Sequence, residues 1–265
     1  MYEFTYQQPK SLAEALSLLS GDEEAMALAG GMTLIPSMKH RLTAPTQLLD
    51  IAALPELQGI SHEGKQLIVG AASPHAMVAS DPMVTKVIPA LAALAGEIGD
   101  PQVRARGTIG GSLANNDPAA DYPAAALGLA ATIHTDRREI AADDFFQGMF
   151  ETALEPGELI CKIAFQVPTS AAYAKFHHPA SGYAMTGVMV ARLDSHIRVA
   201  VTGAAPSVFR WTAAEHALEK TFSSEAIAGL SVDAGGLNSD LHAPAQYRAN
   251  LVSVMTARAI AACGA

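Results

Sequence analysis

The sequence has little cysteine. Cys161 and Cys263 are its only two cysteines, and neither belongs to a C-x-x-C pair. Zinc ribbons, thioredoxin-type redox motifs and cysteine-ligated iron–sulfur clusters all need paired thiols, so this chain alone can build none of them. We therefore interpret both as core or near-terminal thiols and expect a reducing, cytoplasmic location.

Patterns that bind metals or perform catalysis are also scarce. His177 and His178 are adjacent, but neighbouring residues of a strand point to opposite faces and cannot easily share one ion. Asp117 and Asp121 fit turn and helix-cap roles better than paired-carboxylate chemistry. Because no nucleophile, base and orienting residue form a series, we expect neither a metal site nor a catalytic residue in this chain.

The chain is short of positive charge and of long apolar runs. It has 17 Lys and Arg against 26 Asp and Glu, a net charge of -9, so nucleic acid is not an expected partner. The N-terminus, MYEFTYQQPK, is polar, and no apolar run reaches the ~20 residues that a membrane span needs. We therefore expect no signal peptide and no direct membrane insertion.

Helix and strand signals alternate in the first two thirds of the chain. Ser11 and Glu14 form an S-x-x-E capping box before a helix that Gly21 ends. Other helix starts are indicated at Thr33, Ser73-Pro74, Asp81-Pro82, Pro89 and Asp121 to Pro123. Strands are indicated at 25–29, 47–52, 66–73 and 157–168, with a hairpin that turns near Asp136.

The pattern changes near residues 166–172. A hairpin that turns at Asp194-Ser195 is followed by helical segments at 212–220, 223–231 and 243–263. Strands followed by helices predict an α+β fold. We place a domain boundary at residue 168, with 169–265 as the second domain.

Two glycine loops stand out, LAGGMTLIP (28–36) and RGTIGGSLANNDPAADYP (106–123). Paired glycines allow positive φ and close approach of a ligand, and successive N–H groups that point into one concavity form an anion nest. A diphosphate could therefore be held by backbone alone. Neither loop is a Walker loop or a G-x-G-x-x-G fingerprint, and each by itself could be an ordinary tight turn.

Five blocks carry a family resemblance: LAGGMTLIPSMKHRL, VGAASPHAMV, IGDPQVRARGTIGGSLANNDPAADYPAAALGL, ALEPGELICKIAF and KFHHPASGYAMTGVMVA. In this order and spacing the chain resembles the FAD-binding medium subunit of the molybdenum hydroxylases, the family of bacterial carbon monoxide dehydrogenase. The flavin domain of xanthine dehydrogenase is similar. The resemblance covers about residues 3–262. It implies an FAD-binding domain of the vanillyl-alcohol oxidase (PCMH) type with subdomains of about 1–55 and 56–168. A smaller α+β domain with a three-stranded antiparallel sheet and helices is expected to follow.

The resemblance also implies cofactor-binding residues. A first wall around the FAD diphosphate is implied at Ala29, Gly30, Gly31, Met32 and Thr33. A second wall is implied at Thr108, Ile109, Gly110, Gly111 and Ser112. Asp121 matches an acidic residue at the adenosine end, and Ile160 and Lys175 match positions that touch the flavin. Met32 replaces a polar residue that is frequent in the family.

One side chain and two substitutions are left to the structure. Tyr183 either stacks near the flavin ring or is a core or hairpin residue. Gly30→Val and Gly110→Val are expected to block FAD binding and leave the fold largely intact.

The implied function is that of a flavin electron carrier in a larger enzyme. Electrons would come from [2Fe-2S] clusters in a small partner subunit, and a large partner subunit would hold the molybdenum cofactor. The expected assembly is a dimer of heterotrimers that passes electrons to an external acceptor. Two alternatives stay open: a self-sufficient FAD-dependent oxidase or dehydrogenase, and a flavin-free assembly subunit.

Overall fold

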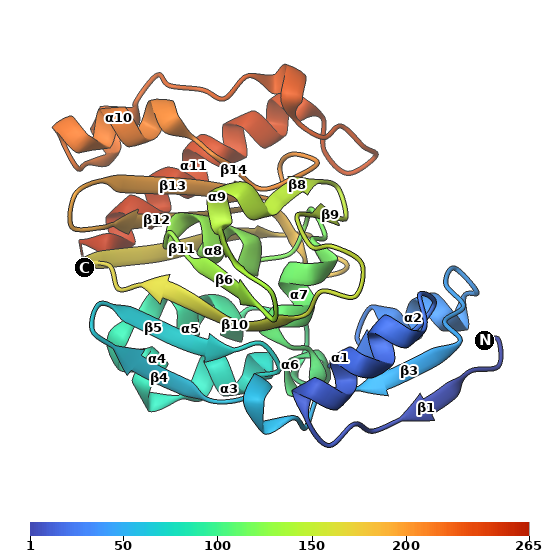
Figure 1. Cartoon of the computed structure of the whole chain (residues 1–265). Coiled ribbons are helices and arrows are strands. Elements are labelled where there is room, and N and C mark those ends of the chain that lie inside the picture. The colour runs from blue at the N-terminus through green and yellow to red at the C-terminus, as the bar shows by residue number, and fades with distance from the viewer. Residues whose placement is uncertain (265) are drawn as a thin grey trace.

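A computed structural model describes residues 1–264 as an α+β fold, as predicted (Figure 1). The N-terminal part contains a parallel sheet of order β1-β3-β2. Its elements are β1 (Thr5–Gln7), α1 (Leu12–Gly21), β2 (Met26–Leu28), α2 (Leu34–Lys39), β3 (Gln47–Asp50) and the 3-10 helix η1 (Pro55–Leu57). This part lies to one side of the molecule, next to α6 (Figure 1).

Helix α1 begins at the predicted capping box. The Ser11 hydroxyl accepts a hydrogen bond from the Glu14 N–H, and the helix buries Ala15 and Leu19 against the small sheet. Helix α2 begins after Thr33 as predicted, but Thr33 makes no side-chain capping bond. The first glycine loop therefore connects the end of β2 to an uncapped helix start.

The middle part is built on an antiparallel sheet of order β4-β5-β10-β6-β7. Its strands are β4 (Ile60–Glu63), β5 (Gln66–Gly70), β6 (Thr132–Thr135), β7 (Glu139–Ala141) and β10 (Ile160–Gln166). The helices are α3 (His75–Ser80), α4 (Pro82–Val87), α5 (Pro89–Gly96), α6 (Pro101–Arg106), α7 (Ile109–Asn115), α8 (Tyr122–Gly128) and α9 (Ala142–Phe145). A small hairpin pairs β8 (Phe146–Gly148) with β9 (Glu151–Thr152). One core cluster joins the sheet to these helices.

Two helix starts in this part test the predictions. Asp81 caps α4 by accepting hydrogen bonds from two backbone N–H groups, as predicted. Ser73 does not cap α3, because an isolated bridge to Thr108 keeps Pro74 extended and the helix begins one residue later. The buried Ser73 hydroxyl has no partner among the described residues.

The C-terminal sheet has the order β11-β12-β13-β14 and is antiparallel. Its elements are β11 (Ser170–His177), β12 (Ala184–Arg192), β13 (Ile197–Thr202), β14 (Phe209–Arg210), α10 (Thr212–Lys220), η2 (Ser224–Ile227), η3 (Ala234–Gly236) and α11 (Ala245–Cys263). The expected count of three strands is short by one, because the two-residue β14 pairs with the edge of β13. Only a 3-10 turn forms where a helix was predicted at 223–231.

Strand β12 is covered on both faces, so eight of its nine residues are buried. Helix α11 packs against β11 and β12 on one face, and α8 of the middle part packs against β12 and β13. The long helix lies along the sheet at the top of the molecule (Figure 1). No helix in the described part of the chain combines the length and apolar character needed to cross a membrane.

Candidate cofactor site

The two glycine loops touch each other through their backbones. A Cβ on Gly30 would lie 2.1 Å from the carbonyl oxygen of Arg106. A Cβ on Gly110 would lie 2.6 Å from the Cβ of Ala71. The expectation that valine at either position leaves the fold intact is therefore wrong, because both glycines occupy contacts that hold the fold together.

The first loop offers a row of free donors. Among the described residues, no hydrogen-bond acceptor is found for the backbone N–H groups of Gly30, Gly31, Met32 and Thr33. Gly31 has a φ of 72°, which glycine adopts without strain. The loop is only partly buried. Consecutive, accessible N–H groups are the chemistry of an anion nest, so this loop can hold a diphosphate without a lysine or arginine.

The second loop does not offer the free N–H groups that we expected. Ile109 donates to the Ser73 carbonyl at 3.1 Å, and Gly110 donates to the Ala71 carbonyl at 2.9 Å. The N–H groups of Gly111 and Ser112 bond to the side chain and the carbonyl of Thr108. These donors fasten α7 to the middle part, so the loop can supply a rigid wall but not a second nest.

A buried charged cluster joins β11 to the start of α8. The Lys175 ammonium is 3.0 Å from the Asp121 carboxylate, and their side chains are 0% and 4% exposed. The Tyr173 hydroxyl donates to Asp121 at 2.6 Å, and Lys175 also donates to the carbonyl of Glu97. Burial, followed by the Asp121 carboxylate, raises the pKa of Tyr173 well above its usual value, so this hydroxyl keeps its proton.

Gly187 makes room for this cluster. It pairs with Lys175 across the sheet, and a Cβ on it would lie 2.1 Å from the Tyr173 hydroxyl oxygen. The tyrosine can therefore cross over β12 and reach Asp121. Sequence reasoning missed both residues, because the contact between them depends on the pairing of β11 with β12.

The cluster brings together two residues that were expected at different ends of FAD. Asp121 was expected at the adenosine end of FAD and Lys175 at the flavin end, yet the two side chains form an ion pair. Asp121 also makes no side-chain capping bond to α8. Ile160 begins β10 and is 6% exposed, with its side chain in the core of the middle part.

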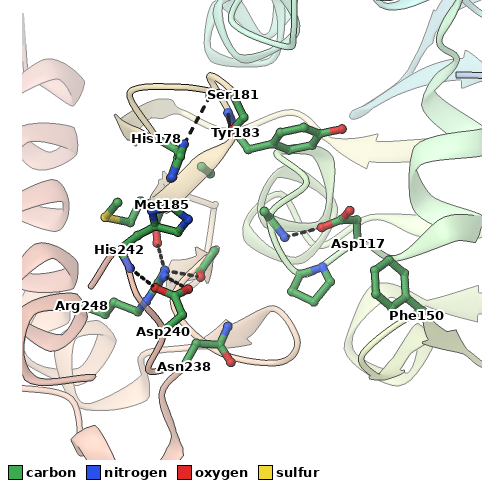
Figure 2. A pocket seen from close by; sticks show the side chains of 14 residues that line it. Asp117, Phe150, His178, Ser181, Tyr183, Met185, Asn238, Asp240, His242 and Arg248 are labelled. Carbon is green, nitrogen blue, oxygen red and sulfur yellow. Dashed lines mark hydrogen bonds and ion pairs between the residues drawn. The ribbon is translucent and has the colours of Figure 1, made fainter. Parts of the chain in front are cut away.

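A cavity of about 510 Å³ lies between the middle and C-terminal parts (Figure 2). It is lined by the loop from Asp117 to Ala119, by Phe150, by the loop after β11 and by residues from the C-terminal part. Tyr183 lies on its wall with 53% of its surface exposed, so Tyr183 is not a core residue. Nothing in the described chain groups three or more His, Cys, Asp or Glu residues as a metal site.

Comparison with known proteins agrees with these features. The protein family described as "FAD binding domain in molybdopterin dehydrogenase" matches residues 2–170. The carbon monoxide dehydrogenase medium chain of Hydrogenophaga pseudoflava is 37% identical, over 99% of this chain and 97% of that protein. The nicotine 6-hydroxylase medium subunit of Paenarthrobacter nicotinovorans is 34% identical, over 98% of this chain and 97% of that protein.

Solved structures show the same likeness. Carbon monoxide dehydrogenase from Hydrogenophaga pseudoflava superimposes with a TM-score of 0.91 at 36% identity, covering 99% of this chain and 98% of the other. Quinoline 2-oxidoreductase from Pseudomonas putida 86 gives a TM-score of 0.89 at 28% identity, covering 99% and 97%. The fold and the glycine-loop site thus define a flavin-binding oxidoreductase subunit. The chain belongs to the family of FAD-binding medium subunits of the molybdenum hydroxylases.

Proposed function

We propose that this chain is the FAD-carrying electron-transfer subunit of a multi-subunit molybdenum hydroxylase. The observation that carries the proposal is the row of four free N–H groups in the first glycine loop, within a chain whose family binds FAD. Bound FAD supplies the redox chemistry. The protein then has to bind it, orient it and set the charge around its ring.

Different residues contact different parts of the bound FAD. The N–H groups of Gly30 to Thr33 hold the diphosphate, with Ala29 at the entry of the loop. The N-terminal turn of α7, at Thr108 to Ser112, forms the opposite wall, and its exposed Gly111 leaves space for the ligand. Lys175 provides a buried cation beside the flavin, and Asp121 and Tyr173 hold that cation in place. A cation there favours the reduced, anionic form of the ring.

We also propose the partner subunits of this chain and the boundary between its two domains. We place a small [2Fe-2S] subunit upstream of the flavin, a large subunit with the molybdenum cofactor beyond it, and an external acceptor downstream, in a dimer of heterotrimers. Relatives of this chain are named as medium chains or medium subunits. We divide the chain after residue 168, between the end of β10 at Gln166 and the start of β11 at Ser170.

A charge placed at the nest tests the proposal. Met32 is 40% exposed, and its own N–H is one of the free donors. Met32→Glu sets a carboxylate beside the diphosphate, and repulsion at this range is expected to weaken FAD binding by about tenfold or more. FAD affinity is measured by fluorescence titration of the purified chain.

Leu42→Glu is the matched control, because Leu42 is 80% exposed and lies after α2, outside the loop. Equal FAD affinity in both variants would contradict the nest. Unfolding midpoints in urea confirm that neither variant has lost its fold.

A further inference from the structure

His177 lies on the same face of the C-terminal sheet as Lys175. One residue of β11 separates the two, and alternate residues of a strand point to the same side of its sheet. Tyr173, two residues before Lys175, packs on the core of the middle part, whereas Phe176 packs on the opposite face with α11. His177 therefore faces the middle part, as Lys175 does.

Glu97 contacts both of these residues. Its carboxylate lies 3.5 Å from the His177 Nε2 atom, and its backbone carbonyl accepts a hydrogen bond from the Lys175 ammonium at 3.2 Å. Glu97 directly follows α5, so this carbonyl lies at the negative end of the helix dipole, which stabilises a cation. The Lys175 side chain is 0% exposed and the His177 side chain is 49% exposed. Glu97 thus links a buried cation to a histidine that water can reach.

The charges around His177 come from a small set of described residues. Lys175 and Asp121 form the buried ion pair, Tyr173 is neutral and donates to Asp121, and Glu97 carries the outermost carboxylate. Helix α5 and the part of β12 that pairs with the end of β11 contain no charged residue, and α11 lies on the other face of the sheet. One cation and two carboxylates leave the set negative when His177 is neutral and balanced when His177 is protonated.

Glu97 is electrically coupled to both basic residues. Burial raises the pKa of the Glu97 carboxyl, and the charges of His177 and Lys175 oppose that rise. Histidine is the side chain whose charge ordinarily changes between about pH 5 and 8. A change in the protonation of His177 therefore alters the charge next to Lys175 near neutral pH.

We propose that His177, paired with Glu97, is a proton-binding site linked to reduction of the flavin. The inference rests on the proposed function, in which Lys175 lies beside the flavin ring. His177 takes up one proton from water when two electrons from the iron–sulfur partner and one proton give the ring its reduced, anionic form. Both protons are released when the two electrons pass to the external acceptor. His177 and Glu97 act through Lys175 and are therefore positioning residues.

The first measurement needs no flavin. The imidazole resonances of the FAD-free full chain are followed by NMR over a range of pH, and the His177 resonance is assigned by its loss in His177→Gln. Glu97→Gln removes the carboxylate that favours the protonated ring but keeps the backbone carbonyl that bonds to Lys175. At a fixed pH, the ratio of protonated to neutral His177 is expected to fall about threefold, as for a half-exposed ion pair. His62, an exposed histidine of β4, is the control and should titrate unchanged.

The second measurement uses the chain loaded with FAD. FAD content is recorded first, and a chain that binds no FAD contradicts the proposed function itself. The loaded chain is then reduced electrochemically without oxygen, and His177 is titrated in both redox states. The ratio of protonated to neutral His177 is expected to be about fivefold higher in the reduced chain, because a negative charge nearby favours the protonated ring.

The redox equilibrium must respond by the same factor, because coupling between two sites is reciprocal. At a fixed potential, His177→Gln is expected to lower the ratio of reduced to oxidised flavin by up to about fivefold near pH 5.5 and to leave it unchanged near pH 8.5. Glu97→Gln is expected to raise this ratio near pH 8.5, where it removes an unbalanced negative charge. His62→Gln is the matched control and should leave the ratio unchanged at both pH values.

Three results would overturn the inference. In the first, His177 titrates identically in the oxidised and the reduced chain. In the second, His177→Gln behaves like His62→Gln in the redox equilibrium at low pH. In the third, His177→Gln changes the ratio of reduced to oxidised flavin equally at both pH values, which would show a structural effect in place of a linked proton.

Discussion

Gly30 lies so close to the backbone of Arg106 and Gly107 that no side chain fits between them. This contact holds the diphosphate loop against the turn that precedes α7. Ligand binding and packing therefore depend on the same atoms. At this position the two effects have to be separated by measuring folding and binding independently.

Gly30→Ala is expected to destabilise the chain by about 1–3 kcal/mol, because its Cβ would force the two loops apart. Gly21→Ala is the matched control: nothing lies within 4 Å of its Cβ, and it ends a helix. The control should be neutral or stabilising by less than about 1 kcal/mol. Urea denaturation measures both, and equal stability of the two variants would contradict the contact.

His75 makes the second glycine loop sensitive to acid. Its backbone N–H donates to the Gly107 carbonyl, and its ring is buried next to the ring of Tyr122. Burial, followed by the charge of Arg104, lowers the pKa of His75 to about 4. Between pH 6.5 and about pH 4, the His75 ring therefore stays neutral in the native state but is protonated in the unfolded chain.

Stability is therefore expected to fall as the pH drops from 6.5 towards 4, by up to about 3 kcal/mol from this residue. The sign follows from the unfolded state binding more protons in that window. His75→Phe should flatten the dependence between these pH values, even if it lowers the stability at pH 7. An unchanged pH slope in the variant would show that another group is responsible.

At the scale of elements, α7 is the least expected feature. Its segment, IGGSLAN, contains two glycines and follows a turn-rich block, so local propensity gave no reason to predict a helix. The helix forms because its N–H groups bond to carbonyls of Ser73 and Ala71, which are distant in sequence. Long periodic helices such as α10 and α11 were predictable, since their apolar positions repeat with the helical period.

Asn116 ends α7 and fixes the β8–β9 hairpin. It has a φ of 42° and is 1% exposed, and its side-chain amide donates to the carbonyls of Gly148 and Glu151 at 2.8 Å. Its own carbonyl accepts from Phe150, whose φ is 56°. One asparagine thus determines where the Phe150 ring stands in the cavity wall.

Asn116→Ala is expected to lower the free energy of unfolding by about 1–3 kcal/mol, because both the hydrogen bonds and the favourable left-handed residue are lost. Asn116→Gly keeps the backbone conformation and loses only the side-chain bonds, so it should fall between Ala and the natural residue. Chemical denaturation measures the free energy of unfolding of the natural chain and of both variants, and so ranks their stabilities. An alanine variant as stable as the natural chain would exclude this anchoring role.

At the scale of the whole molecule, the middle and C-terminal parts are fastened by charge as well as by α8. Asp143 of α9 accepts hydrogen bonds from Arg198 of β13 and Arg210 of β14. Arg210 also pairs with Glu215, whose side chain is 4% exposed. These ion pairs fix the middle part relative to the C-terminal part, and the two parts form opposite walls of the cavity.

The family and the first glycine loop could be read from the sequence, because their residues are contiguous. The Lys175–Asp121 pair, the Tyr173–Gly187 contact and the cavity could not be read from it. Each depends on residues brought together by the sheet pairing of β11 with β12 and by α8. The sequence around Asp121 carries no information about which distant cation the carboxylate meets, so the ion pair with Lys175 could not be predicted.

The most direct measurement for the central claim is an equilibrium titration of the purified full chain with FAD, followed in the visible spectrum of the flavin. We predict saturable binding of a single FAD per chain, with a shifted, structured flavin spectrum that shows the ring in a protein environment. A folded chain that leaves the FAD spectrum unchanged at every concentration would contradict the account.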